Sequence, residues 1–238
     1  MDSNEMVELS QEFAVLGGDL HGDGDNSAAL HRMVELAVKH VRGCSWASIT
    51  VVRDGRGHTI AASDPVAMTA DELQYSNGEG PCLQAAEDNA NYLMFDVVGE
   101  ARWPRYAAAL AEQTPVRSAL SFQLVAQESA ALNLFADSPG AFDDEAITTA
   151  TVLTTHVSSL VALYEAEGKA EHLETALSTS RQIGAAVGVL MAHHKVTQDQ
   201  AFVMLRTASQ HLHRKLRDVA ADVVDTGTLP EGVLAQSQ

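Results

Sequence analysis

The stretch LYEAEGKAEHLETALSTSRQIGAAVGVLM, residues 163–191, decides how the chain is organised. Apolar or small residues recur in it at alternating steps of three and four, at positions 163, 166, 170, 173, 177, 180, 184, 187 and 191. This spacing is typical of the seam of a coiled coil. Residues 147–191 contain no proline, so they can form one long helix. The alternative is a single amphipathic helix packed on its own domain. Small side chains in the seam favour close approach of two helices, and we therefore expect a homodimer.

Residues before this helix alternate between strand and helix patterns. Runs rich in β-branched and aromatic side chains predict strands at 46–52, 59–62, 92–95, 117–126 and 130–136. Apolar residues at helical spacing predict helices at 27–41, 69–75, 81–88 and 104–113. This order predicts an antiparallel sheet flanked by helices, which is an α+β fold. The first sixteen residues could add a short helix, and the glycines and aspartates of residues 17–27 predict a linker.

Two shorter helices are expected after the long one. Thr197 and Gln200 form a capping box, followed by one expected apolar face of Ala201, Phe202, Leu205 and Ala208. A further apolar stripe runs to Gly227, which suits a helix C-terminus, and contains Leu212, Leu216, Val219, Ala220 and Val223. Together with the end of the long helix, these segments predict an all-α bundle of three helices.

The charge of the chain is unevenly distributed. The net charge is −17, yet residues 178–238 contain six Lys and Arg against five Asp and Glu. An acidic body disfavours a protein that coats nucleic acid or lies on anionic lipid, whereas a locally basic tail suggests a second part with a different partner. No run approaches the ~20 apolar residues of a membrane span, and the first residues show no signal-peptide pattern. We therefore expect a cytoplasmic protein without membrane contact.

No arrangement of residues typical of an active site occurs. Residues 78–81 lack the spacing and the lysine of a phosphate-binding loop, and Cys44 and Cys82 are too far apart to form a paired thiolate motif. Cys82 could act as a nucleophile beside a histidine, but a small buried cysteine is the more common case. Four histidines lack the usual spacing of a zinc site: His193, His194, His211 and His213. We expect no enzymatic activity, no metal and no cofactor.

The basic residues of the tail are a better indication of function. With the stripe from Leu212 to Val223 facing inward, four neighbouring side chains are left around the outside: His213, Arg214, Lys215 and Arg217. Arg181 and Arg206 add two more bases. Arginine and lysine suit phosphate contacts, and imidazole rings can stack on unpaired bases. An ordinary solvated surface is the alternative, because three carboxylates lie close by: Asp218, Asp222 and Asp225. Charge alone supports both interpretations equally.

Residues 180–230, SRQIGAAVGVLMAHHKVTQDQAFVMLRTASQHLHRKLRDVAADVVDTGTLP, resemble an ANTAR domain, the RNA-binding module of bacterial transcription antiterminators. The resemblance is carried by Arg181, Ile183-Gly184-x-Ala186-x-Gly188-x-Leu190-Met191, Ala201-Phe202-x-x-Leu205-Arg206 and Lys215-Leu216-x-x-Val219-Ala220. Two residues depart from the family pattern: Val187 stands where many members carry lysine, and His213 where many carry asparagine. These departures leave open the alternative that the tail binds a partner protein instead of RNA.

Residues 28–165 are similar to a GAF domain of the kind joined to ANTAR modules in actinobacteria. GEGPCL at 78–83, RWPRY at 102–106 and LNLFA at 132–136 carry this likeness. The resemblance implies a sensor domain that could bind an unidentified small molecule. GAF domains elsewhere bind cyclic nucleotides, haem or tetrapyrroles, and no motif here selects one of these ligands.

Together the two resemblances imply a GAF–ANTAR antitermination regulator. Its dimer would bind two hexaloop hairpins of nascent mRNA and prevent the competing terminator from folding. The implied division is an N-terminal segment and linker (1–27), a GAF-like sensor (28–165), a coiled-coil linker (166–180) and an ANTAR domain (181–238). The expected RNA-binding residues are Arg181, Arg206, His213, Arg214, Lys215 and Arg217. The alternative is a signalling or scaffold protein that senses a small ligand and binds no RNA. A DNA-binding regulator is disfavoured because the last two helices lack a glycine turn between them.

Overall fold

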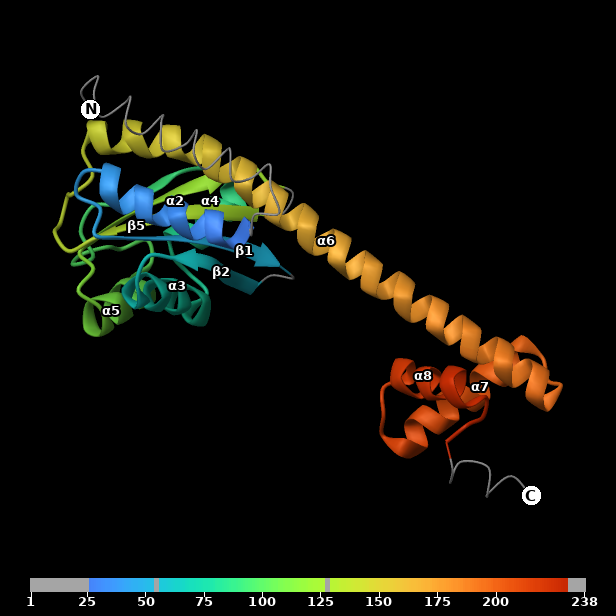
Figure 1. Cartoon of the computed structure of the whole chain (residues 1–238). Helices are drawn as coiled ribbons and strands as arrows, with labels where there is room; N and C mark the ends of the chain where they lie inside the picture. Colours follow the sequence, from blue (N-terminus) through green and yellow to red (C-terminus); the bar gives the residue numbers. More distant parts are fainter. Residues whose placement is uncertain (1–25, 54–55, 127–128, 231–238) are drawn as a thin grey trace. The chain divides into compact units, whose positions relative to one another are not determined.

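The computed structural model describes residues 26–53, 56–126 and 129–230. The chain divides between Ala166 and Glu167 into two compact units, called here the sheet unit and the helical unit. One helix, α6 (Asp144–His194), contributes residues to both units (Figure 1). The helix expected within residues 1–16, and the linker expected at 17–27 up to residue 25, lie outside the described residues.

The sheet unit contains five antiparallel strands in the order β2-β1-β5-β4-β3. The strands are β1 (Trp46–Arg53), β2 (Arg56–Ala62), β3 (Tyr92–Met94), β4 (Ser118–Leu124) and β5 (Ser129–Ala136). Besides the first part of α6, the helices are α2 (Asn26–His40), α3 (Pro65–Asn77), α4 (Pro81–Asp88) and α5 (Pro104–Gln113). The predicted α+β fold, an antiparallel sheet with flanking helices, is therefore confirmed.

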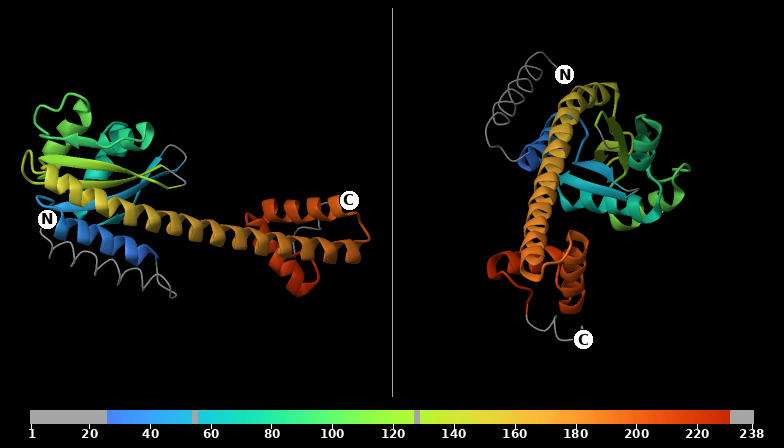
Figure 2. Two further views of the ribbon diagram at one scale, coloured as in Figure 1. Left: turned by 90° about the horizontal axis from the view of Figure 1, so that it is seen from above. Right: turned by 90° about the vertical axis from the view of Figure 1, so that its right-hand side faces the viewer.

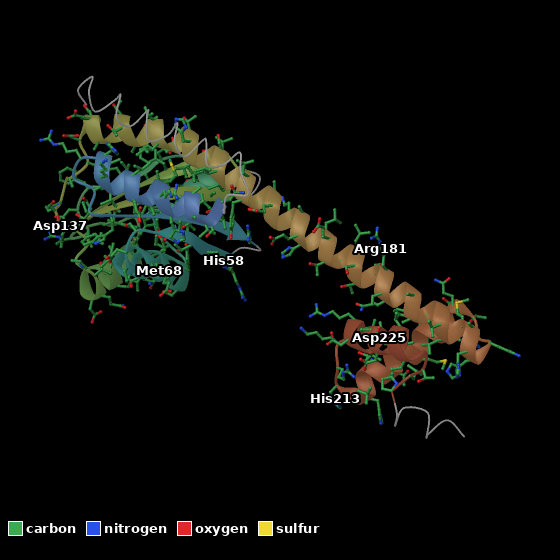
Figure 3. The ribbon with its side chains drawn as sticks, viewed as in Figure 1. His58, Met68, Asp137, Arg181, His213 and Asp225 are labelled. Atoms are coloured by element: carbon green, nitrogen blue, oxygen red, sulfur yellow. The ribbon has the colours of Figure 1, made fainter. Side chains whose placement is uncertain are left out.

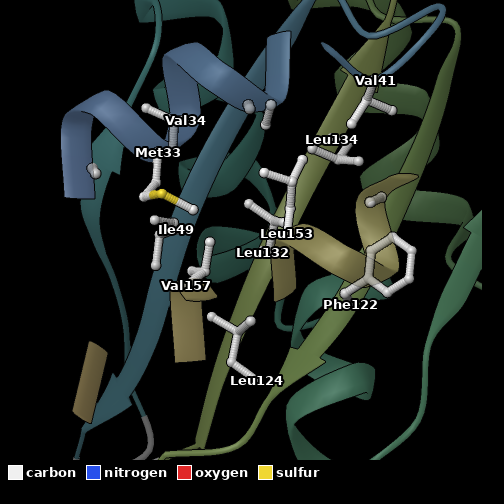
Figure 4. Close-up of a cluster of buried hydrophobic side chains, with 14 of the residues drawn as sticks. Met33, Val34, Val41, Ile49, Phe122, Leu124, Leu132, Leu134, Leu153 and Val157 are labelled. Carbon is white, nitrogen blue, oxygen red and sulfur yellow. The ribbon is translucent and has the colours of Figure 1, made fainter. Parts of the chain in front are cut away.

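The two faces of the sheet differ in polarity. On the face covered by α2 and α6, the strands present fully buried apolar side chains such as Ile49, Leu132 and Leu134 (Figures 2 and 4). Neighbouring strand residues point to the opposite face, which α3 and α4 cover, with α5 packed against α3. There β1 and β5 present the polar residues Thr50 and Asn133, both also fully buried. The sheet therefore has one apolar core and one core with a polar centre.

Local chemistry decides where several helices begin. Helices α4 and α5 begin at Pro81 and Pro104, as predicted, because the fixed φ and missing N–H of proline suit a first helical turn. Helix α3 begins at Pro65, before the predicted 69, because the Asp64 carboxylate accepts a hydrogen bond of 2.8 Å from the Val66 N–H. It ends at Gly78, whose φ of +65° is a left-handed conformation that glycine adopts without strain.

Glu79 joins the loop after α3 to the first turn of α5. Its carboxylate accepts hydrogen bonds from the backbone N–H groups of Arg105 and Tyr106, at 2.6 and 3.1 Å, and from the Arg105 guanidinium. N–H groups in a first turn have no partner within their own helix. Glu79 supplies that partner, since the N-cap residue Trp103 makes no side-chain capping bond. One carboxylate thus connects the sequence motifs at 78–83 and 102–106.

The helical unit packs the end of α6 against α7 (Gln198–Leu212) and α8 (Leu216–Thr226). Its fully buried core consists of Ala186, Leu190, Ala201, Leu205, Ala208, Val219, Ala220 and Val223. Thr197 and Gln200 form the predicted capping box, with side-chain to backbone bonds of 3.0 and 3.4 Å. The predicted bundle of helices at the end of the chain is confirmed.

Two details of this unit correct the sequence predictions. Leu212 ends α7 instead of belonging to the last helix, His213 takes a left-handed φ of +52°, and Lys215 is the N-cap of α8. The turn therefore forms without a glycine, so the missing glycine does not by itself argue against a DNA-binding regulator. Phe202, expected on the buried face of α7, is 41% exposed. It follows the buried Ala201 by one residue, and one residue is about 100° around a helix.

The apolar seam predicted along α6 is exposed in its first part and packed within the helical unit in its last part. Leu163, Leu173 and Leu177 are 48%, 63% and 47% exposed, and the small residues between them are exposed as well. Val187 and Met191 instead pack within the helical unit. The stretch from 163 to 177 therefore presents apolar side chains to solvent on a helix that packs them against no other described element.

By length and composition alone, α6 could cross a membrane, and it is the one helix in the described ranges that meets this test. A core helix of a sheet domain meets the same test. Here 39% of the most apolar window is buried within the protein, and α6 packs on the sheet through Ala146, Ala150, Leu153, Val157, Leu160 and Val161. The test is thus weak support for a membrane span.

Truncating the apolar core should destabilise the sheet unit. Leu132 is fully buried between the sheet and its covering helices (Figure 4), so Leu132→Ala should lower the free energy of unfolding by about 3 kcal/mol. Both tryptophans of the chain, Trp46 and Trp103, lie in the sheet unit, so their fluorescence during denaturant unfolding reports on it. Val125→Ala, at a residue that is 78% exposed, is the control and should change little. Equal effects of the two changes would contradict this description of the core.

Candidate functional sites

The six bases expected to contact RNA all lie on the surface of the helical unit. Arg181 projects from α6 (Figure 3), and Arg206 is exposed on α7. The other four fall within five residues, at the turn between α7 and α8: His213, Arg214, Lys215 and Arg217. All six are exposed. The turn thus gathers four of them, while Arg181 and Arg206 come from separate helices.

Backbone hydrogen bonds hold this turn in place. The Arg214 N–H donates to the Ser209 carbonyl at 3.1 Å, and the Ser209 hydroxyl donates to the Arg214 carbonyl at 2.6 Å. The His213 N–H donates to the Gln210 carbonyl at 3.3 Å. The turn therefore presents its side chains from a fixed backbone.

Neighbouring carboxylates already hold two of the bases. Arg214 pairs with Asp222 at 2.5 Å, and this carboxylate holds the pKa of the guanidinium above its ordinary value. Arg217 lies 3.4 Å from Asp218. Within the described ranges no ion pair involves Arg181, Arg206 or Lys215. Exposed ion pairs contribute little to stability, so a phosphate can compete for both arginines.

An exposed aromatic side chain lies one helical turn before Arg206. Phe202 precedes Arg206 by four residues on α7, so the two side chains share one face of the helix. An aromatic ring beside a guanidinium is an arrangement on which unpaired bases can stack. Sequence reasoning placed Phe202 in the core. Its offset of one residue from Ala201, which is buried, was the signal that could have identified it as exposed.

The histidines of this unit do not gather into a metal site. His193 and His194 are in edge-to-face contact, with ring centroids 4.8 Å apart. In the described part of the chain, no group of three or more His, Cys, Asp or Glu side chains is placed to hold a metal ion.

A second candidate site lies inside the sheet unit, on the polar face of the sheet. Asp71 of α3 is fully buried and accepts hydrogen bonds from Thr59, Asn133 and Thr50 at 2.8, 3.0 and 3.3 Å. Tyr75, one turn further along α3, donates to Thr50 at 2.9 Å. We call these residues the Asp71 cluster. Sequence reasoning missed it, because its members come from β1, β2, β5 and α3.

Burial controls the protonation of this cluster. Removal from water raises the pKa of Asp71 from 3.8 to about 6, although its hydrogen bonds oppose the shift. Cys82 at the start of α4 is fully buried beside it, and desolvation, together with the charge of Asp71, raises the pKa of the thiol to about 12. A thiol so far from ionisation is a poor nucleophile. Cys82 is therefore the small buried cysteine that the sequence favoured.

Three arginines on this side of the sheet unit are paired with carboxylates. Arg102 contacts Glu100 at 2.6 Å, Arg105 contacts Glu79 at 3.0 Å and Arg117 contacts Asp96 at 3.1 Å. Arg102 also lies over the Trp103 ring, 4.2 Å from its centroid, and the Trp103 indole N–H donates to Gln84 at 2.8 Å. The RWPRY motif is thus explained by contacts within the sheet unit.

Comparison with known families identifies both units. A family model for the GAF domain matches residues 25–162, which is more than half of the chain. The chain therefore belongs to the GAF domain family. A model for the ANTAR domain matches residues 171–224, so the chain has the domain order of a GAF–ANTAR regulator, as the sequence resemblance implied. ANTAR domains are RNA-binding antitermination domains, and GAF domains sense small molecules. No curated protein matches the chain significantly.

Solved structures of low sequence identity share the fold. The GAF domain of the Acinetobacter phosphoenolpyruvate-protein phosphotransferase is 13% identical over 71% of this chain and 99% of its own, with a TM-score of 0.51. Free methionine-R-sulfoxide reductase from Neisseria meningitidis is 16% identical over 66% of this chain and 89% of its own, with a TM-score of 0.50. The Stigmatella aurantiaca phytochrome photosensory core module is 14% identical over 89% of this chain and 46% of its own, with a TM-score of 0.52. These likenesses concern the fold alone.

The raised pKa of Asp71 predicts a pH dependence of stability. A carboxyl that binds its proton more tightly in the folded state stabilises the protein below pH ~4 and loses this contribution as pH rises through about 6. Across this interval the free energy of unfolding of wild type relative to Asp71→Asn should fall by up to about 3 kcal/mol. Tryptophan fluorescence during denaturant unfolding measures it. The comparison with Asp71→Asn removes the opposite contributions of other carboxylates with lowered pKa, such as Asp96 and Glu100. Parallel pH profiles of the two proteins would contradict the prediction.

Proposed function

We propose that this protein is a transcription antitermination regulator that acts without catalysis. As a homodimer, it binds paired hairpin loops in nascent mRNA, in the cytoplasm, under control of its GAF domain. The proposed division is a sensor at 28–165, a linker helix at 166–180 and an RNA-binding domain at 181–238. The observation that carries the proposal is the exposed basic turn at 213–217, which lies within the segment that matches the ANTAR family.

The distribution of charge supports RNA contact through the helical unit alone. Lys215 and Arg206 are exposed bases without an ion pair in the described residues, and Arg214 and Arg217 can exchange their carboxylates for phosphates. Phe202 adds a surface on which a splayed base can stack. The remainder of the chain is acidic and repels RNA, so contact is confined to this unit.

The exposed stripe of α6 supports the dimer. Leu163, Leu173 and Leu177 recur at coiled-coil spacing and are half exposed in the single chain. A second copy of the same helix would bury them, with the small residues 166 and 170 allowing close approach. Each helical unit alone would bind one hairpin weakly, and pairing raises the effective concentration of the second unit.

Contacts within the sheet unit support its control over α6. Arg53, the last residue of β1, lies over the Tyr164 ring of α6, 5.9 Å from its centroid. The same strand supplies Thr50 to the Asp71 cluster. A change at the cluster can thus be transmitted through β1 to Tyr164 of α6. Tyr164 lies two residues before the boundary between the units at Ala166.

The two departures from the family pattern do not favour the alternative of an RNA-indifferent scaffold. Val187 is 6% exposed within the helical unit, so this substitution changes the interior of the bundle and not its surface. His213 holds a left-handed turn position, a conformation that both histidine and asparagine adopt more readily than most residues. The sheet unit of a scaffold would look the same, so RNA binding decides between the two.

Removing two bases from the turn should weaken RNA binding. Lys215→Ala combined with Arg217→Ala should lower affinity for a paired-hairpin RNA by about tenfold and reduce the slope of log affinity against log salt by ~1.5. Filter binding or fluorescence anisotropy across a salt series measures both quantities. Arg56→Ala, an exposed base of the sheet unit, is the control and should change neither. Unchanged affinity and slope in the double variant would exclude this turn from the interface.

Removing the carboxylate that holds Arg214 should strengthen RNA binding. Asp222→Asn frees the guanidinium for phosphate and deletes a nearby negative charge, with an expected gain of about threefold. Asp225→Asn deletes a charge from the same helix at an exposed carboxylate, and its smaller effect measures the contribution of net charge alone. The same anisotropy assay applies. Equal gains from the two variants would show that the ion pair with Asp222 does not compete with RNA.

A charge within the exposed stripe should break the dimer. Leu173→Glu would place two like charges in the seam and should give a monomer by sedimentation. Its affinity for a two-hairpin RNA should fall by on the order of a hundredfold, towards that for one hairpin. Thr175→Glu adds the same charge to an exposed position on the other side of the helix and should leave the dimer intact. A wild-type monomer, or a dimer that tolerates Leu173→Glu, would refute the proposed seam.

A further inference from the structure

Buried polar groups beside the Asp71 cluster lack partners. The Gln74 Nε2 and the Tyr106 hydroxyl make no hydrogen bond within the described structure, although both residues are fully buried. The Oε1 of Gln74 is in use, because it accepts the Cys82 N–H at 2.8 Å. A buried donor without an acceptor destabilises a folded protein, so such groups call for a functional explanation.

Asp71 itself has donors but no counter-ion. Thr50, Thr59 and Asn133 are neutral, so no positive charge offsets the desolvation of this buried carboxylate. The arginines on this side of the sheet unit form ion pairs with Glu79, Asp96 and Glu100 instead. No base in the described residues forms an ion pair with Asp71. The cluster is therefore a negative site that is open to a positive group.

The unsatisfied groups belong to one place in the fold. Asp71 and Gln74 are three residues apart on α3, and therefore lie on the same face of the helix. Tyr106 enters from α5, and the charge of Asp71 contributes to raising the pKa of its hydroxyl. Apolar side chains surround them, including Ala67, Ala70 and Phe135. The surroundings thus combine one carboxylate, two free hydrogen-bonding groups and apolar walls.

We propose that this place is a binding site for a small primary amine that also carries a hydrogen-bond acceptor. The ammonium group pairs with Asp71, and the acceptor takes the amide N–H of Gln74 and the hydroxyl of Tyr106. A phosphate-bearing ligand such as a cyclic nucleotide is disfavoured, because it carries no ammonium group for Asp71 and its negative charge is repelled by the carboxylate. An amine bound here would be the ligand of the proposed sensor domain. The proposal rests on the proposed function only where it implies that ligand binding changes RNA binding.

The loop between α3 and α4 lies over this site. A Cβ at Gly80 would lie 2.3 Å from the Gln74 Oε1, so the loop backbone is in direct contact with the site. Gly78 and Gly80 flank Glu79 with φ of +65° and +149°, and Glu79 holds the loop to α5 through Arg105. A ligand would reach the site by displacing this loop, which the ion pair between Glu79 and Arg105 holds to α5.

Calorimetry on the full chain tests the proposal. The probes are the free amino acids and linear diamines, each compared with its amine-free counterpart, the hydroxy acid or the diol. At least one amine should bind wild type and Glu72→Gln, which removes an exposed charge from the same helix, but not Asp71→Asn. Its affinity should be about tenfold weaker at pH ~5 than at pH ~7.5, because Asp71, with a pKa of about 6, is then mostly protonated.

A second variant keeps the proposal testable if Asp71→Asn fails to fold. Tyr106→Phe deletes a hydroxyl without a partner, so the unliganded protein should melt at the same or a higher temperature, while amine binding weakens severalfold. The proposal is overturned if no amine binds more tightly than its counterpart, or if Asp71→Asn or Tyr106→Phe binds as tightly as wild type. RNA is absent from these titrations, so their failure is distinguishable from failure of the proposed antitermination function.

Discussion

The structure depends on a single constraint, the unbroken backbone hydrogen bonding of α6 over 51 residues. Its first turns bury apolar side chains against the sheet, and its last turns supply one wall of the helical unit. Between these segments, Leu163, Leu173 and Leu177 face solvent in the single chain. Burial of a half-exposed leucine contributes on the order of 1 kcal/mol, so this stretch would gain stability from the partner helix of the proposed dimer. A helix that serves two units, and that in the proposed dimer pairs with a copy of itself, would couple events in one unit to the other.

Side chains alternate between the two faces of the sheet along each strand, so the apolar core lies on one face and the polar cluster on the other. Apolar residues on one face, such as Leu132 and Ile49, pack under α2 and α6. Their neighbours in sequence, Asn133 and Thr50, form a polar centre under α3. A buried carboxylate held only by neutral donors costs stability, and a fold retains such a feature when it has a use. The polar face, and not the apolar one, is therefore where this sensor domain differs from a purely structural sheet.

Local chemistry made much of the fold predictable from the sequence. Pro81, Pro104 and the Thr197–Gln200 capping box set helix starts within a few residues, and the structure has them where the pattern placed them. Asp64 was missed as a cap, and α3 consequently begins earlier than expected. The turn at His213 was missed as well, because a left-handed histidine carries no strong sequence signal.

The candidate sites were less predictable, for a physical reason. The basic residues of the helical unit lie close together in sequence, so their exposure could be expected, although the pairing of Arg214 with Asp222 could not. The Asp71 cluster joins residues up to 83 positions apart, and only the pairing of β1 with β5 brings them together. Whether the predicted bases contact RNA stays a prediction.

The most direct test of the account is the stoichiometry of an RNA complex. Full-length protein would be mixed with an RNA that carries two hexaloop hairpins, and the mass of the complex would be measured by light scattering after size exclusion. The account predicts two chains on one RNA, with no stable complex when either loop is scrambled. One chain per RNA, or a complex indifferent to the second loop, would contradict it.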